Sequence, residues 1–105
     1  MVFTLNFVEN LFRLLADGTP LFIGLGLAIA ALSATIGLME GWRVSDSLYY
    51  GFITATTVGY GDMIPSNGLG KLISVVLSII GLIMTGIMIA LAVEAADITY
   101  KQLNP

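Results

Sequence analysis

The sequence predicts an all-α membrane protein in which two transmembrane helices flank a short re-entrant segment. Three observations support this fold class. The 105 residues are 57% hydrophobic and only 10% charged, and the mean hydropathy of +0.96 lies far above that of soluble domains. Two charge-free stretches have the length of a membrane span, and a shorter one lies between them. A chain of this length is expected to form a single domain.

The residue types that are absent exclude several kinds of site. Without cysteine or histidine, the chain offers no disulfide, no thiolate metal site and no common general base. No nucleophile and base pair is evident, so neither an enzyme nor a small-molecule substrate is expected. The net charge is -3, and the four basic residues do not cluster, so nucleic acid is not an expected partner.

Residues 21–39 and 72–93 are nineteen and twenty-two residues without a charge. A helix needs roughly 20 apolar residues to cross the hydrocarbon, so both are predicted transmembrane helices. Thr19 is expected to cap the first helix, with Pro20 at its start. No basic segment or cleavage pattern precedes the first span, so a signal peptide is not expected. Two spans put both termini on one side, but the basic residues are evenly divided and leave the orientation open.

Residues 1–18 are predicted to form an amphipathic interfacial helix. Apolar side chains occupy one side, and polar residues recur at helical spacing on the other: Asn6, Glu9, Asn10, Arg13 and Asp17. Glu9 and Arg13 also form a favourable i,i+4 pair. Gly18 and Pro20 favour a break before the first span, with a cytoplasmic extension of that span as the alternative.

The stretch between the spans raises a different problem, because residues 47–61 carry no charge but are too few to cross the membrane as a helix. Ser45 can cap a short helix with Asp46 in its first turn. Backbone that is not helical is tolerated at membrane depth only if it is buried in protein or lines a watery cavity. Gly59 and Gly61 can adopt positive φ, which turns successive carbonyls to the same side. We therefore predict a column of backbone oxygens that faces water or ions.

Residues 56–62, TTVGYGD, resemble the selectivity filter of potassium channels. The order of span, short helix, filter and span resembles the two-transmembrane members of that family over about residues 20–93. The resemblance implies that K+ is the permeant ion and that backbone carbonyls bind it: Thr57, Val58, Gly59 and Tyr60. It also implies that Gly61 marks the outer mouth and that Asp62 accepts a hydrogen bond from Tyr49 or Tyr50 on the pore helix.

In the second span, Ser74, Ser78, Gly81 and Thr85 share one small, weakly polar face. The family resemblance implies that four residues face a water-filled cavity: Leu82, Thr85, Ile89 and Val93. Gly81 resembles the glycine at which such inner helices bend, and close helix packing is an equal alternative.

Glu94 and Asp97 follow the second span. At an intracellular entrance they would raise the local cation concentration, and the alternative is that they are solvated helix ends.

One chain cannot enclose a pore, and the resemblance implies a homotetramer in the lipid bilayer of the cell membrane, with cytoplasmic termini. The expected parts of the single pore domain are an interfacial helix at 1–18, an outer helix at 19–40, a turret, pore helix, filter and outer loop at 41–71, an inner helix at 72–97 and a tail at 98–105. The expected function is a potassium-selective channel. The alternatives are a weakly selective cation channel and a non-conducting two-span scaffold or regulatory subunit.

Overall fold

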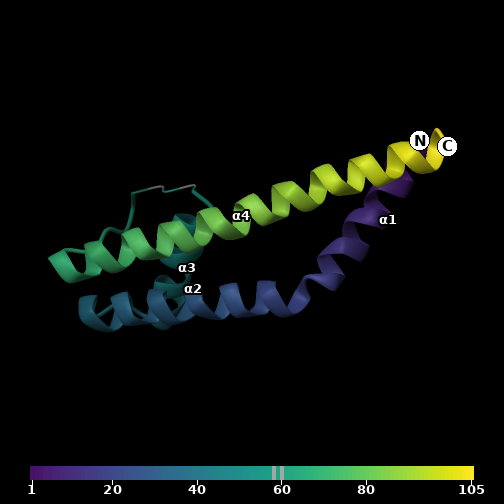
Figure 1. Cartoon of the computed structure of the whole chain (residues 1–105). Coiled ribbons are helices and arrows are strands. Elements are labelled where there is room, and N and C mark those ends of the chain that lie inside the picture. Colours follow the sequence, from purple (N-terminus) through teal and green to yellow (C-terminus); the bar gives the residue numbers. More distant parts are fainter. Residues whose placement is uncertain (58, 60) are drawn as a thin grey trace.

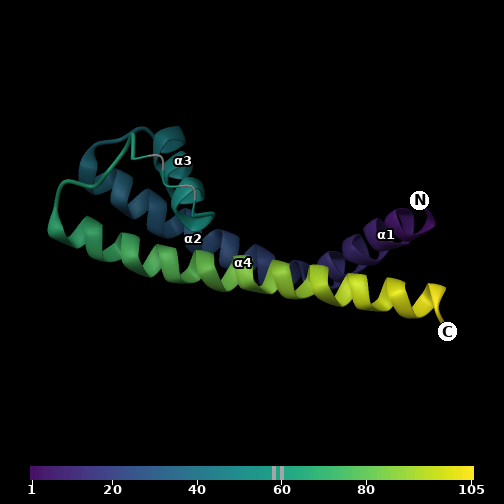
Figure 2. The same cartoon turned by 90° about the horizontal axis from the view of Figure 1, so that it is seen from above.

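The computed structural model describes residues 1–57, 59 and 61–105. These residues form four helices in chain order: α1 (Val2–Asp17), α2 (Thr19–Glu40), α3 (Val44–Ala55) and α4 (Gly68–Leu103). Helix α4 runs the full length of the molecule with α2 beside it, α3 packs near one end, and both termini lie at the other end with α1 (Figure 1, Figure 2). The predicted all-helical class is confirmed.

Helices α2 and α4 cover the two predicted spans and are long and apolar enough to cross a membrane. At 1.5 Å per residue, the 22 residues of α2 extend about 33 Å, and the 36 residues of α4 extend about 54 Å. The hydrocarbon core is only about 30 Å thick. Helix α4 therefore continues well beyond the bilayer, and it ends at Leu103, inside the segment expected to be a tail.

The apolar side chains of both helices are mostly exposed in the single chain, such as Leu27 on α2 and Ile79 on α4. A core helix of a soluble protein would bury them. The surface therefore fits an environment of lipid and further chains, and the protein is placed in a membrane.

The helix ends agree with the sequence in part. Gly18 separates α1 from α2, so the predicted break is confirmed. The predicted Thr19 cap is wrong: Thr19 lies within α2, and its hydroxyl donates to the carbonyl of Leu15 at 3.3 Å. The predicted Ser45 cap is also wrong, because the N-cap is Arg43, two residues earlier, and α3 begins at Val44. Asp46 lies in the first turn of α3 as expected.

The buried core lies where α3 meets the two long helices. It consists of Ile29 and Ile36 from α2, Tyr50 and Ala55 from α3, and Leu77 from α4. Helix α3 is therefore held by apolar contacts on both sides.

Two serine–glycine contacts bring α3 close to α2. Ser47 of α3 lies against Gly37, and Ser33 of α2 lies against Gly51; a Cβ added to either glycine would lie 2.7 Å from the serine Cβ. Both serine hydroxyls donate to carbonyls four residues earlier in their own helices, so they are buried without loss of a hydrogen bond. From Ser33 to Gly37 along α2, the contacting residue on α3 changes from Gly51 to Ser47, so the two helices run antiparallel.

Candidate functional site

The end of α3 sets the depth at which the TTVGYGD segment begins. A Cβ at Gly81 of α4 would lie 2.7 Å from the carbonyl carbon of Ala55, so the last residue of α3 contacts Gly81 directly. Gly81 is the tenth of the twenty-two residues in the charge-free stretch 72–93. The segment that follows α3 thus starts close to the middle of a membrane-spanning helix.

Positive φ angles occur in this segment, as predicted. Gly59 has φ +55° and Gly61 has φ +79°, which confirms the expected left-handed backbone at both glycines. Thr57 has φ +66°, which the sequence did not indicate, because β-branched residues rarely adopt this conformation. Val58 and Tyr60, two of the four predicted carbonyl ligands, lie outside the described residues.

The backbone after α3 returns to the end of that helix. Three amides donate to carbonyls of its last turn: Thr56 to Phe52 at 2.9 Å, Thr57 to Thr54 at 3.2 Å and Gly59 to Ile53 at 3.0 Å. These bonds satisfy carbonyls that the helix itself leaves unpaired. Thr57, Gly59 and Gly61 are nevertheless exposed, as is Asp62. In a single chain these four residues are therefore accessible from outside rather than packed inside the fold.

A carboxylate anchors the loop between the TTVGYGD segment and α4. Glu40, the last residue of α2, accepts hydrogen bonds from the amide and the hydroxyl of Ser66, both at 2.7 Å, and from the amide of Asn67 at 3.3 Å. The side chain of Asn67 in turn caps α4 by accepting from the amide of Gly70 at 2.6 Å. The sequence analysis missed Glu40, whose partners lie 26 and 27 residues away.

The two tyrosines expected to support Asp62 lie in different environments. Tyr50 is almost fully buried, and its hydroxyl lies 2.8 Å from Oγ of Ser74 on α4. Tyr49 is 39% exposed. The hydrogen bond from Tyr49 or Tyr50 to Asp62 stays a prediction.

The predicted cavity residues lie on exposed parts of α4. Leu82, Ile89 and Val93 are more than half exposed in the single chain, and Thr85 is partly buried. Gly81 is buried, and α4 is an uninterrupted helix through this position. The cavity assignment and the bending role of Gly81 stay predictions, and the contact with Ala55 gives Gly81 a packing role.

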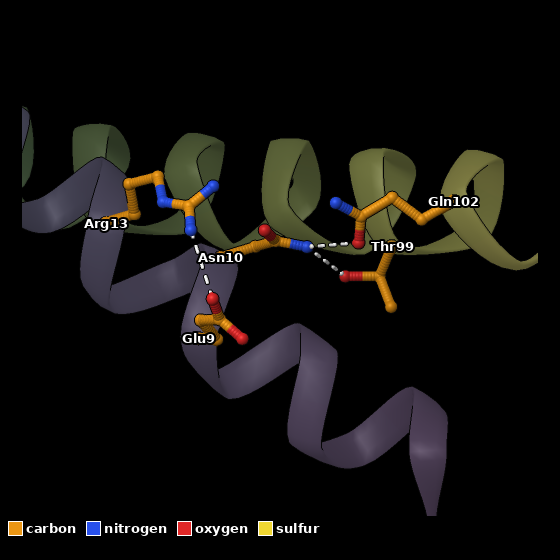
Figure 3. A network of polar contacts seen from close by, with 5 residues as sticks. All are labelled: Glu9, Asn10, Arg13, Thr99 and Gln102. Carbon is orange, nitrogen blue, oxygen red and sulfur yellow. Dashed lines mark hydrogen bonds and ion pairs between the residues drawn. The ribbon is translucent and has the colours of Figure 1, made fainter.

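A polar network joins α1 to the distal end of α4 (Figure 3). The side-chain amide of Asn10 donates to Oγ1 of Thr99 at 2.9 Å and to Oε1 of Gln102 at 3.1 Å, and both Asn10 and Thr99 are buried. The expected polar side of α1 is therefore divided. Asn10 faces α4, whereas Glu9 and Arg13 form the predicted ion pair, at 3.0 Å, in an exposed position.

Glu94 and Asp97, the predicted residues of the inner mouth, are both exposed on α4. Asp97 forms an ion pair with Lys101 at 3.0 Å. The sequence analysis did not include Lys101 in this group, although its i,i+4 spacing from Asp97 is visible in the sequence. With Lys101 the local charge per chain is -1 rather than -2, since two carboxylates and one ammonium group lie together.

Comparisons with known proteins assign this arrangement to a family. Residues 19–97 match the family model described as "Ion channel". Two pore potassium channel a from Oryza sativa subsp. japonica is 35% identical over 82 residues, which cover 75% of this chain and 23% of that protein. Potassium channel subfamily K member 4 from Rattus norvegicus is 34% identical over 62 residues, 59% of this chain and 16% of that protein.

A putative potassium channel protein from Rhodopseudomonas palustris is 31% identical over 52 residues, which cover 50% of this chain and 13% of that protein. The chain thus spans less than a quarter of the length of these relatives. No solved structure matches the chain. Since the matched region includes α2, α3, the segment after it and α4 as far as Asp97, the chain belongs to the ion channel family, whose members are channels rather than enzymes.

Proposed function

We propose that four copies of this chain form a potassium-selective channel. Dehydrated K+ passes along the backbone carbonyls of residues 57–60, and the Thr57 hydroxyl closes the innermost site. The observation that carries this proposal is the TTVGYGD segment, which begins at mid-depth of α4 directly after α3. The family match and the names of the relatives support it.

The chemistry follows from the backbone. Carbonyl oxygens in successive rings replace the hydration shell of a cation. Helix α3 enters the bilayer as a re-entrant pore helix, and the negative end of its dipole lies where the segment begins, which favours a cation there. The positive φ angles at Gly59 and Gly61 allow neighbouring carbonyls to turn toward one axis.

Four identical chains around that axis supply the other walls, because Thr57, Gly59 and Gly61 are exposed in the single chain and one chain cannot enclose a pore. The assembly lies in the cell membrane with cytoplasmic termini. Helix α1 then lies at the inner membrane surface, where Leu5, Val8 and Phe12 form an exposed apolar stripe at helical spacing. Placing that stripe against lipid removes it from water.

The test is a measurement of reversal potential on the purified protein in liposomes, with K+ on one side and Na+ on the other. Potassium selectivity shifts the reversal potential strongly in the direction set by K+. Current that reverses near zero would instead indicate the weakly selective cation channel. Inserted and assembled protein that carries no current would indicate a non-conducting scaffold.

The glycines of the segment give a second, sharper test. Gly59→Ala and Gly61→Ala are each expected to abolish selective conduction, because a Cβ is strained at these positive φ angles, although among the described residues it would meet no neighbour within 4 Å. Gly26→Ala is the matched control, since it also lies in open space but within the regular helix α2. Normal selectivity in both filter variants would contradict the carbonyl-column mechanism.

A further inference from the structure

Tyr50 forms a side-chain connection between α3 and α4. Its ring is 8% exposed and packs edge-on against Trp42, with centroids 5.3 Å apart. Its hydroxyl lies 2.8 Å from Oγ of Ser74, which is 24 residues further along the chain. The two residues therefore connect the helix that precedes the TTVGYGD segment to the helix that follows it.

The direction of this hydrogen bond follows from the number of protons. A serine hydroxyl carries one hydrogen, and that of Ser74 is donated to the carbonyl of Gly70 at 2.9 Å. Both contacts of Ser74 can be hydrogen bonds at the same time only when Tyr50 donates and Ser74 accepts through a lone pair. Because a phenol also has only one hydrogen, a Tyr50 that donates to Ser74 has no proton left for Asp62.

A second contact holds the other end of α3. Ala55, five residues or about 7.5 Å along the helix from Tyr50, packs on Gly81. A helix held at two points on the same neighbour cannot slide or rotate on it without breaking one of them. The segment with the predicted ion-binding carbonyls begins two residues after Ala55, so its depth and rotation depend on these contacts.

We propose that Tyr50 and Ser74 are positioning residues for ion selectivity. Their hydrogen bond fixes the rotation of α3 on α4 and thereby the aim of the carbonyls that follow α3. Neither side chain contacts the ion. This inference rests on the proposed function, because it explains how one chain holds the segment that selects K+.

The test compares Tyr50→Phe, Ser74→Ala and the double variant with the wild type. The readout is the permeability ratio of Na+ to K+ from the reversal potential. A reversal potential does not depend on how many channels fold, so a loss of folded protein alone leaves it unchanged. Each single variant is expected to raise the ratio about 2- to 10-fold, the range that corresponds to the net loss of one hydrogen bond. The double variant is expected to match the single ones, because each removes the same bond.

Two further serine variants serve as controls. Ser78→Ala removes a hydroxyl one turn further along α4 that donates only to the carbonyl of Ser74 within the same helix, at 2.9 Å, and it is expected to keep the wild-type ratio. Ser74→Thr keeps the hydroxyl and is also expected to keep the wild-type permeability ratio.

Unchanged selectivity in Tyr50→Phe and Ser74→Ala, with a selective wild type, would overturn this inference alone. Additive effects in the double variant would overturn it as well. A wild type without selectivity would overturn the proposed function and the inference with it.

Discussion

Gly81→Ala gives a direct test of why a glycine occupies the middle of α4. The added Cβ would meet three backbone atoms of Ala55, with the carbonyl carbon at 2.7 Å and the carbonyl oxygen and Cα closer still. Backbone atoms cannot rotate away as a flexible side chain can. The end of α3 must therefore move, or α4 must bend away from it.

The required movement can be worked out from the structure. Ordinary contact begins at 3.4 Å, so the carbonyl carbon alone must shift by about 0.7 Å, the difference between 3.4 and 2.7 Å. Functional groups must be held within about 0.5 Å of their working geometry, so this shift is large enough to disturb the segment that follows Ala55. Overpacking of this kind costs about 1–3 kcal/mol.

The matched control is Gly86→Ala, five residues further along the same helix, where a Cβ meets nothing within 4 Å in the part of the chain that the structure describes. Alanine favours a helix over glycine by about 1 kcal/mol, so this variant is expected to be neutral or slightly stabilising. The difference in stability between the two variants therefore measures the clash with Ala55 separately from the general effect of replacing a glycine in a helix.

Two assays on the purified protein distinguish the explanations. Gly81→Ala is expected to lower the thermal stability of the assembled protein and to reduce the preference for K+ in the reversal potential, whereas Gly86→Ala is expected to lower neither. A purely bending role for Gly81 would instead alter how often the channel opens and leave stability and selectivity intact. Wild-type stability and selectivity in Gly81→Ala would refute the packing explanation.

Two further predictions concern the end of the molecule that carries both termini (Figure 1). The double variant Glu94→Gln, Asp97→Asn is expected to lower outward single-channel current at low ionic strength and to have little effect near 1 M salt, where the Debye length is about 3 Å. Lys101→Gln should raise the current at low salt, because it removes the positive charge beside Asp97. Equal currents in the wild type and both variants would leave these residues as solvated helix ends. Asn10→Ala is expected to destabilise the folded protein by about 1–3 kcal/mol in thermal or denaturant unfolding, because it removes two hydrogen bonds from a buried contact. The control Glu9→Gln removes only an exposed ion pair and should change the stability by less than about 0.5 kcal/mol. Equal stability of these last two variants would show that the buried amide contributes nothing.

The features that the sequence determined by itself are those set by neighbouring residues. A charge-free run of sufficient length partitions into the bilayer as a helix wherever it occurs, so both spans could be predicted before any contact was known. The positive φ at Gly59 and Gly61 follows from the glycines themselves, and the break at Gly18 follows from the local residue pattern. The TTVGYGD motif was sufficient to indicate the class of protein, which the family match confirms.

The tertiary structure alone decided which distant groups meet. The Tyr50 hydroxyl could have formed a hydrogen bond with Asp62 or with a residue of α4, and only the packing of α3 on α4 places it beside Ser74. Glu40 and Asn10 read as ordinary surface residues in the sequence, yet the first holds Ser66 and the second is buried on Thr99, 89 residues away. Even the caps at Thr19 and Ser45 were misplaced, since several nearby residues can begin a helix and tertiary contacts select among them. Hydrophobic length is a property of a segment, whereas a hydrogen bond between segments depends on how the helices are rotated against one another, and that rotation is fixed by close contacts such as Ala55 on Gly81.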